Sequence, residues 1–250
     1  TGPEPEVLPS TPADAPRTPR MAGPGTADIS QPELLTLQRA PFAVRVLNNL
    51  TAAATAASIT EFNALGANDT ARLTAFVDQQ LNPSAIDDSA LEARLSAANG
   101  YTTLNKSLAQ LWADHALVTT DSSAPARETQ RAALLRAAYS KRQLQETMVD
   151  FWQNHFNVAI NSGTPSTVYV HYNRDVIRAN VFGNFRTMLE AVGQSTAMMY
   201  YLNNRSNSRS GPNENYAREL LELHALGAEN YLGFVSPAQV PPAPEDPNYP

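Results

Sequence analysis

Proline is unevenly distributed along this chain of 250 residues, and its distribution limits what each part can fold into. Residues 1–30 contain seven prolines and residues 231–250 contain six, whereas residues 31–230 contain only six. Because proline lacks an amide donor and fixes φ, the two ends are poorly suited to regular helix. We therefore expect Pro-rich extended arms at residues 1–30 and 231–250, the second a tail or linker, around one folded domain at residues 31–230.

The segment between the arms shows the apolar period of helices and no sustained alternation typical of strands. Capping boxes at Ser30, Ser58 and Ser140 predict three of the helix starts. After the helix from Ser30, the expected helices cover residues 42–57, 58–66, 68–81, 88–97, 103–119, 125–138, 140–158, 170–181, 184–192, 195–202 and 212–226. Residues 159–168 are expected to form a loop. The predicted fold class is all-α, an irregular array of many short helices.

Composition excludes several classes of protein. The formal charge is −6 and only 17% of the residues are charged, which argues against nucleic-acid binding, since phosphates require a basic face. No apolar run approaches the ~18 residues of a membrane span. The chain has no cysteine, which excludes disulfides and every Cys-ligated metal site. With 42% hydrophobic residues, the chain has enough apolar material for a core.

The helix predicted from Ser140 carries a histidine on its apolar face. At about 100° per residue, His155 shares an arc with Leu144, Met148, Phe151, Trp152 and Phe156, opposite Glu146, Asp150, Asn154 and Asn157. A core imidazole satisfied by hydrogen bonds is one interpretation. An acid, base or ligand at the floor of a pocket is the other. Both interpretations place the imidazole in the interior.

The helix predicted at 212–226 gathers acidic residues on one side. Its polar arc contains Glu214, Asn215, Arg218, Glu219 and Glu222, and its apolar arc contains Tyr216, Leu220, Leu221, Leu223 and His224. Glu222 and His224 point roughly 200° apart, so they cannot chelate one ion. The i, i+4 histidine pair of zinc proteases is absent from the sequence.

Two interpretations of this acidic arc stay open. It is a solvated ladder of ion pairs around Arg218, or it is a functional face flanked by Asn213 and Asn215. In the functional interpretation, Glu214, Glu219 and Glu222 are acid–base groups or bind a hard cation, and Arg218 orients them. The preceding loop adds Arg205 and Arg209 ahead of the helix N-terminus, so it is either an anion site or a surface loop.

Four segments carry a family resemblance. They are residues 76–83 (FVDQQLNP), 148–158 (MVDFWQNHFNV), 173–201 and 212–227 (PNENYARELLELHALG). They resemble the bacterial family known as domain of unknown function 1800, over roughly residues 35–235. Gln153 stands where that family often has a histidine.

The resemblance implies several further expectations. Family members are longer and exported, so this chain resembles an N-terminal portion of a periplasmic or extracellular protein whose signal has been removed. The implied partners are the C-terminal half of the same protein and a co-encoded exported protein with a sulfatase-like fold. The resemblance implies no established reaction.

Two functions are therefore considered. The first is an enzyme, or an enzyme subunit, that acts on an envelope or extracellular polymer through Glu214, Glu219 and Glu222, with His155 beneath them. The alternative is a surface, scaffold or binding protein without catalysis, in which the acidic helix is a structural ion-pair network.

Overall fold

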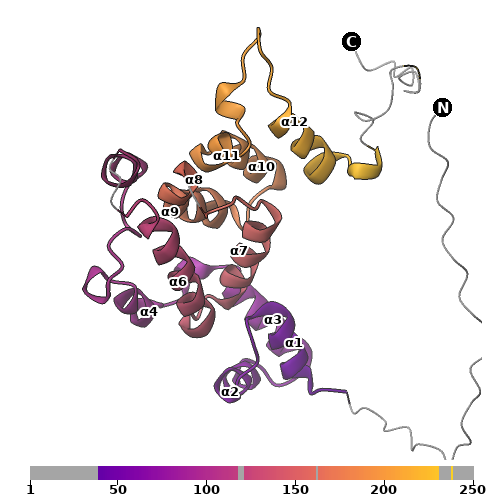
Figure 1. Ribbon diagram of the computed structural model, residues 1–250. Helices are drawn as coiled ribbons and strands as arrows, with labels where there is room; N and C mark the ends of the chain where they lie inside the picture. Colours follow the sequence, from indigo (N-terminus) through magenta and orange to yellow (C-terminus); the bar gives the residue numbers. More distant parts are fainter. Residues whose placement is uncertain (1–38, 118–120, 162, 231–237, 239–250) are drawn as a thin grey trace, which may run out of the picture. The chain divides into compact units, whose positions relative to one another are not determined.

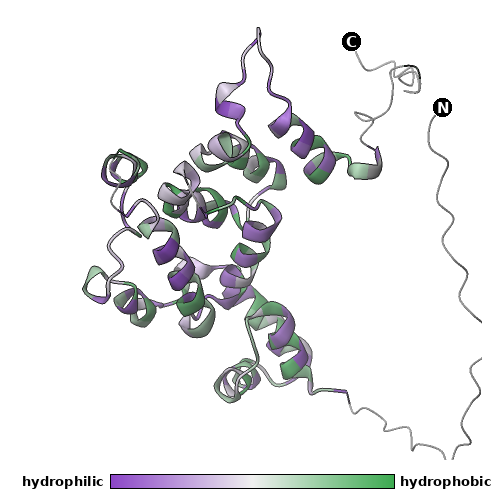
Figure 2. Ribbon diagram, viewed as in Figure 1, coloured by the Kyte–Doolittle hydropathy of each residue, from purple (hydrophilic) through white to green (hydrophobic). Residues whose placement is uncertain are grey.

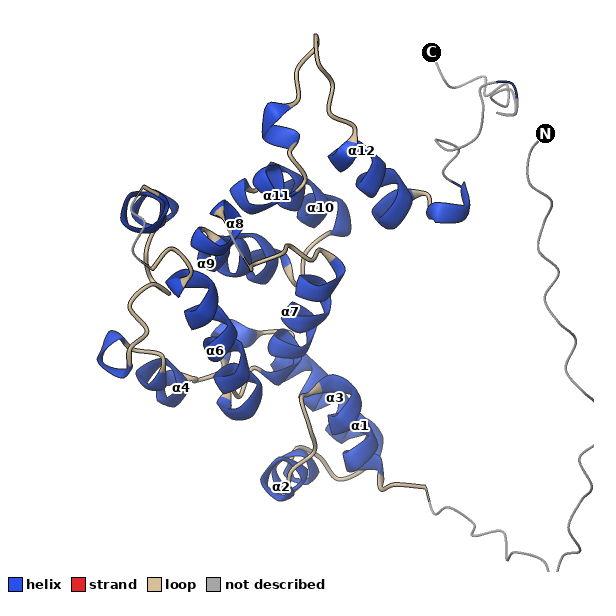
Figure 3. Ribbon diagram, viewed as in Figure 1, coloured by secondary structure: helices blue, strands red, loops and turns tan. Residues whose placement is uncertain are grey.

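The computed structural model describes residues 39–117, 121–161, 163–230 and Ala238 (Figure 1). Over these residues the chain is all-α, as the sequence predicted, and has no strand beyond one isolated bridge between Ser208 and Gly211 (Figure 3). The arm at residues 1–30 lies outside the described residues, as does all of 231–250 except Ala238. None of the described helices has the length and apolar character needed to cross a bilayer.

The first three helices pack around a small core of their own. They are α1 (Phe42–Leu50), α2 (Ala56–Ala64) and α3 (Asp69–Gln80). Leu47 and Phe62 are almost completely buried, and Phe62 meets Phe76 edge to face with ring centroids 5.6 Å apart. Figure 2 shows apolar residues along all three of these helices.

The single helix predicted at 42–57 is wrong, because α1 ends at Leu50. The backbone of Thr51 is extended, and its hydroxyl donates to the carbonyl of Leu47 at 2.6 Å. The capping box is formed by Thr55 and Ser58, one turn earlier than the box predicted from Ser58. Thr55 is therefore the N-cap of α2, and Ser58 occupies the third position of the helix.

A second hydrophobic core is built mainly by the elements between Pro83 and Tyr139. The elements here are η1 (Pro83–Ala85), α4 (Ser89–Arg94), η2 (Ala97–Asn99), α5 (Leu108–Leu111), its π-helical continuation η3 (Trp112–Ala116) and α6 (Ala124–Tyr139). Leu111 and Ala132 are fully buried in this cluster. The buried carboxylate of Glu128 on α6 accepts from the hydroxyls of Thr102 and Thr103 and from the Thr103 amide, which ties the intervening loop to the helix.

Helix α7 (Gln143–His155) starts later than predicted. Ser140 ends α6 instead of capping α7, and its hydroxyl donates to the buried carboxylate of Asp88 at 2.6 Å. The other oxygen of Asp88 accepts from the Lys141 amide at 2.8 Å. A carboxylate 52 residues away in sequence has thus displaced the local capping box.

The largest core is built by α7 and the helices that follow it. These are α8 (Thr164–Thr167), α9 (Tyr169–His171), its π-helical continuation η4 (Tyr172–Arg178), α10 (Phe185–Gln194) and α11 (Thr196–Tyr201). Tyr172 is fully buried and donates its hydroxyl to the carbonyl of Phe156 at 2.6 Å. The loop predicted at 159–168 is wrong in its second half, since α8 places Pro165 in a first turn, where proline is tolerated.

The last described helices form a less buried segment. They are η5 (Asn204–Ser206), α12 (Asn215–Glu219), its π-helical continuation η6 (Leu220–Ala225) and η7 (Ala228–Asn230). No residue of α12 or η6 is buried. Tyr216 packs against the largest core beside Gly193, where a Cβ atom would overlap the tyrosine hydroxyl.

Candidate functional site

Arg218 organises part of the predicted acidic arc. Its guanidinium lies 3.4 Å from Glu219 and 3.6 Å from Glu222, and it donates to the Asn215 side-chain oxygen at 3.3 Å. Glu214 is exposed, and what joins it to Arg218 is the backbone hydrogen bond of 2.8 Å from the Arg218 amide. The ion pairs of Arg218 therefore lie within one helix.

The remaining residues predicted around this arc are placed separately. Asn213 accepts from the Asn215 amide at 3.1 Å, and its own amide donates to Asn207. Arg205 is stacked over the ring of Tyr200, 4.6 Å from its centroid, and Arg209 is exposed. In the part of the chain that the structure describes, no three acidic or histidine residues are arranged to hold a metal ion.

His155 lies on the surface, which corrects the expectation that it is interior. It is the last residue of α7, so the apolar stripe reaches the helix end at this position. Its Nε2 lies 3.3 Å from Nδ1 of His224 on η6, and the ring of Phe156 lies against both imidazoles. The structure thus pairs His155 with His224, a residue that the wheel assigned to the apolar arc, and not with the acidic residues.

A polar hollow of about 430 Å³ lies beside α7. Glu146 and Arg178 line it, joined by two hydrogen bonds of 2.7 Å, with side chains only 10% and 17% exposed. The pair connects α7 to η4, two helices whose polar faces meet here. Because both partners are largely withdrawn from water, the pair is held more tightly than the less buried pairs of Arg218.

Amide groups continue this polar lining. The Asn173 side chain, which is 7% exposed, donates to the Gln153 side-chain oxygen at 3.0 Å. The Nε2 atom of Gln153 and the Nε atom of Arg178 are buried and find no hydrogen-bond partner among the described residues. An unpaired buried donor costs about 1–3 kcal/mol, so an incoming oxygen atom would be stabilised here.

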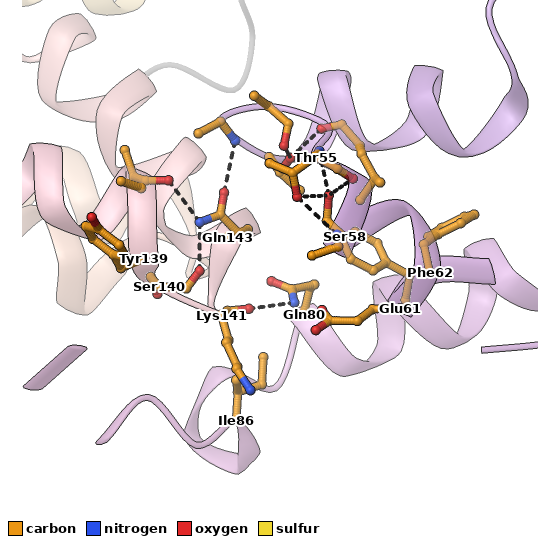
Figure 4. Close-up of a pocket in the computed structure, with 18 of the residues that line it drawn as sticks. Thr55, Ser58, Glu61, Phe62, Gln80, Ile86, Tyr139, Ser140, Lys141 and Gln143 are labelled. Atoms are coloured by element: carbon orange, nitrogen blue, oxygen red, sulfur yellow. Dashed lines mark hydrogen bonds between the residues drawn. The ribbon is translucent and has the colours of Figure 1, made fainter. Parts of the chain in front are cut away.

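A larger hollow of about 750 Å³ lies between the first three helices and α6 (Figure 4). Its floor includes Phe62 and Ile86, and Tyr139 lies along its rim, 53% exposed. Gln143 reaches across and accepts from the Ala52 amide at 3.1 Å, while Gln80 donates to the Lys141 carbonyl at 2.9 Å. Figure 4 shows Gln143, Tyr139 and Ser140 on one side of the hollow and Thr55, Ser58 and Phe62 on the other, with Lys141 and Gln80 between them.

The two hollows adjoin each other. Thr51, Ala52, Leu134 and Ala137 line both of them. The shared residues belong to the α1–α2 connection and to α6, so the hollows lie next to each other along one side of α6. Each hollow combines polar and apolar side chains, and together they provide room for one elongated ligand.

The polar hollow was not identified from the sequence. Glu146 and Asp150 were recognised as one face of a helix, but Arg178 and Asn173 are far along the chain. One signal was present, because Arg178 directly follows the apolar pair Val176 and Ile177 inside a helix. A charge next to two core residues indicates a partly buried ion pair.

The comparison with protein families gives one match. A family model described as "Protein of unknown function (DUF1800)" matches residues 45–233. The match covers most of the chain and confirms the resemblance carried by the four sequence segments. No curated protein and no solved structure matches the chain.

Proposed function

We propose a function from the geometry of this chain, because it belongs to the DUF1800 family and the description of that family names no activity. The function is binding of a saccharide segment of an envelope or extracellular polymer in the two adjoining hollows along α6. The observation that supports it is the unpaired buried Nε2 of Gln153, beside Asn173 and the Glu146–Arg178 pair, in one polar hollow.

The chemistry of the polar hollow favours a neutral ligand rich in hydroxyl groups. Glu146 and Arg178 neutralise each other, and Asp150 adds one negative charge at the exposed edge. An anionic ligand would meet this carboxylate, whereas a hydroxyl group both donates to carboxylates and accepts from amides. A sugar ring presents several such hydroxyls at once.

The larger hollow complements this preference. The exposed ring of Tyr139 and the side chains of Leu134, Ala137 and Ala138 offer apolar surface for the carbon faces of a sugar. A ligand that spans both hollows would exceed one sugar unit, which favours a polymer segment. Such polymers occur outside the cytoplasm, in agreement with the periplasmic or extracellular location that the family resemblance implies.

Binding can be tested by closing each hollow separately. Ala133 lines the polar hollow and Ala138 the larger one, and both are exposed. Tryptophan at either position would fill space without disturbing the core. We expect the wild-type chain to bind at least one member of a panel of soluble neutral oligosaccharides in isothermal titration calorimetry, and Ala133→Trp and Ala138→Trp to weaken that binding at least ~10-fold.

The matched control is Ala109→Trp, an exposed alanine on α5 that lines neither hollow. It should leave the affinity unchanged. If no oligosaccharide binds the wild-type chain, or if all three tryptophan variants bind equally well, the saccharide proposal is wrong.

Catalysis at the acidic helix is a second proposal, favoured by the way Arg218 holds both Glu219 and Glu222. In this proposal Glu214, Glu219 and Glu222, together with His155, act as the acid–base groups that hydrolyse a glycosidic bond of the polymer with water. Release of reducing ends from a bound oligosaccharide, lost in Glu219→Gln and Glu222→Gln, would support it. Intact oligosaccharide after long incubation with the wild-type chain would contradict it.

A further inference from the structure

The two imidazoles at the junction of α7 and η6 have a geometry suited to a metal ion. His155 Nε2 and His224 Nδ1, which are 69 residues apart in sequence, lie 3.3 Å apart. This separation exceeds the about 2.9–3.0 Å typical of a protein hydrogen bond. Zn–N bonds of about 2.0–2.1 Å at the tetrahedral angle place two ligand nitrogens about 3.3–3.4 Å apart.

We propose that His155 and His224 together bind a zinc ion that links the end of α7 to η6. Imidazole suits zinc, copper and nickel, and the tetrahedral spacing favours zinc. No third histidine or carboxylate among the described residues completes the set, so water or an external ligand fills the other positions. The site is outside both hollows, so it is independent of saccharide binding.

The electrostatic surroundings favour a cation at this place. His155 is the last residue of α7, and His224 lies in the last turn of η6. The final carbonyl groups of a helix have no partner within the helix, and they carry the negative end of its dipole. Both imidazoles belong to the last turn of a helix, where the helix dipole favours a cation.

Aromatic packing orients the two rings before a metal arrives. The Phe156 ring, fully buried, lies 4.7 Å from the His155 ring and 4.8 Å from the His224 ring, measured between centroids. Trp152 meets His155 edge to face at 5.5 Å. A ligand pair held in this way loses little conformational freedom on binding, which strengthens a site that has only two protein ligands.

The test uses the untagged chain of 250 residues, stripped of metal with a chelator and then dialysed. Titration with zinc chloride near neutral pH should show one ion per chain. His155→Asn and His224→Asn should each weaken binding at least ~10-fold. Asn154→Ala, an exposed change one residue from His155, and His171→Asn, at a histidine outside the pair, should leave the affinity as in the wild type.

Two further measurements separate a bridging ion from loose surface binding. Cobalt(II) should give the intense visible absorption of a tetrahedral ion in the wild type and not in either variant. Zinc should raise the unfolding temperature of the wild type, with little effect on the variants. If the variants bind zinc as tightly as the wild type, or the wild type fails to bind at millimolar zinc, the proposal is overturned and the imidazoles share a proton instead.

Discussion

Helix α6 and the last helix, formed by α12 and η6, differ in what holds them in place. Helix α6 buries Ala124, Pro125, Ala126, Glu128, Thr129 and Ala132. No residue of α12 or η6 is buried, and Leu223 on η6 is 58% exposed. The inner helix is therefore fixed by the packing of its N-terminal half, whereas the outer helix depends on a few contacts, among them Tyr216 and the histidine pair.

Ion pairs differ in the same way between the inner helices α7 and η4 and the last helix. The inner Arg178 joins η4 to α7 through Glu146, with both side chains mostly withdrawn from solvent. The outer Arg218 pairs with Glu219 and Glu222 of its own helix, and its side chain is 31% exposed. A pair between two helices positions them relative to each other, whereas a pair within one helix stabilises only that helix.

The largest expected effect comes from deleting a core ring. Phe156 is completely buried, with 0% of its surface exposed. Phe156→Ala should therefore leave a cavity and lower the free energy of unfolding by ~3–5 kcal/mol. Leu223→Ala on the outer helix should cost less than ~1 kcal/mol. Urea denaturation of both variants measures this difference. Equal losses would remove the distinction between the two regions.

The inner ion pair should matter more than the outer one. Arg178→Met leaves the Glu146 carboxylate partly buried without its partner, which should cost ~3 kcal/mol of unfolding free energy. Arg218→Met should cost less than ~1 kcal/mol, because water solvates the carboxylates that remain. Chemical denaturation tests both. A large loss of unfolding free energy in Arg218→Met would mean that the ion pairs of Arg218 also hold other helices in place.

The contact between Gly193 and Tyr216 can be broken from either side. Gly193→Ala places a methyl group against the Tyr216 ring and should cost ~1–3 kcal/mol, because the outer helix must shift. In the Tyr216→Leu background the same substitution should cost much less, since the obstacle is gone. Thermal unfolding of the two single variants and the double variant measures the coupling. Additive losses would show that the two residues do not press on each other.

The smallest expected effect is a dependence on pH. Burial holds the pKa of His171, on the inner side, and of His224, on the outer side, below the ordinary value of 6.5, and the neighbouring His155 adds to the lowering at His224. The unfolded chain then binds more protons than the folded chain as pH falls below about 6.5. Stability should therefore be full above that pH and decline below it.

This pH effect is checked by denaturation of the wild type, His171→Asn and His224→Asn across the acidic range, with a chelator present. Each substitution should flatten the decline. A slope that neither substitution changes would assign the acid sensitivity to other groups.

Helix positions were well predicted where local signals act alone. Asn68 caps α3 and Asn184 caps α10, each at the place that the sequence indicated. Prediction failed at Ser140, because the distant Asp88 accepts its hydroxyl, and at His155, because the apolar stripe meets the end of α7 there. In both cases the outcome depended on the tertiary structure, which the residue pattern of a single helix does not contain.

The candidate sites show the same limit. The pairs of Arg218 with Glu222 and with Glu219 follow from spacing within a helix, so the sequence could indicate them. The Glu146–Arg178 pair and the contact between His155 and His224 join segments 32 and 69 residues apart. Their formation depends on how the helices pack against one another. The position of a residue on a helical wheel gives no information about that packing.

Periodicity, capping residues and proline positions were enough to predict an all-α chain, because these signals act within a few residues. The family followed from the sequence segments that resemble it and from the family match. The packing of the helices decided which polar groups face one another. It placed His155 at the surface beside His224, and it assembled the polar hollow from α7 and η4. The physical reason is that burial and pairing are set by neighbours in space, and a chain of short helices can bring many different neighbours to each face.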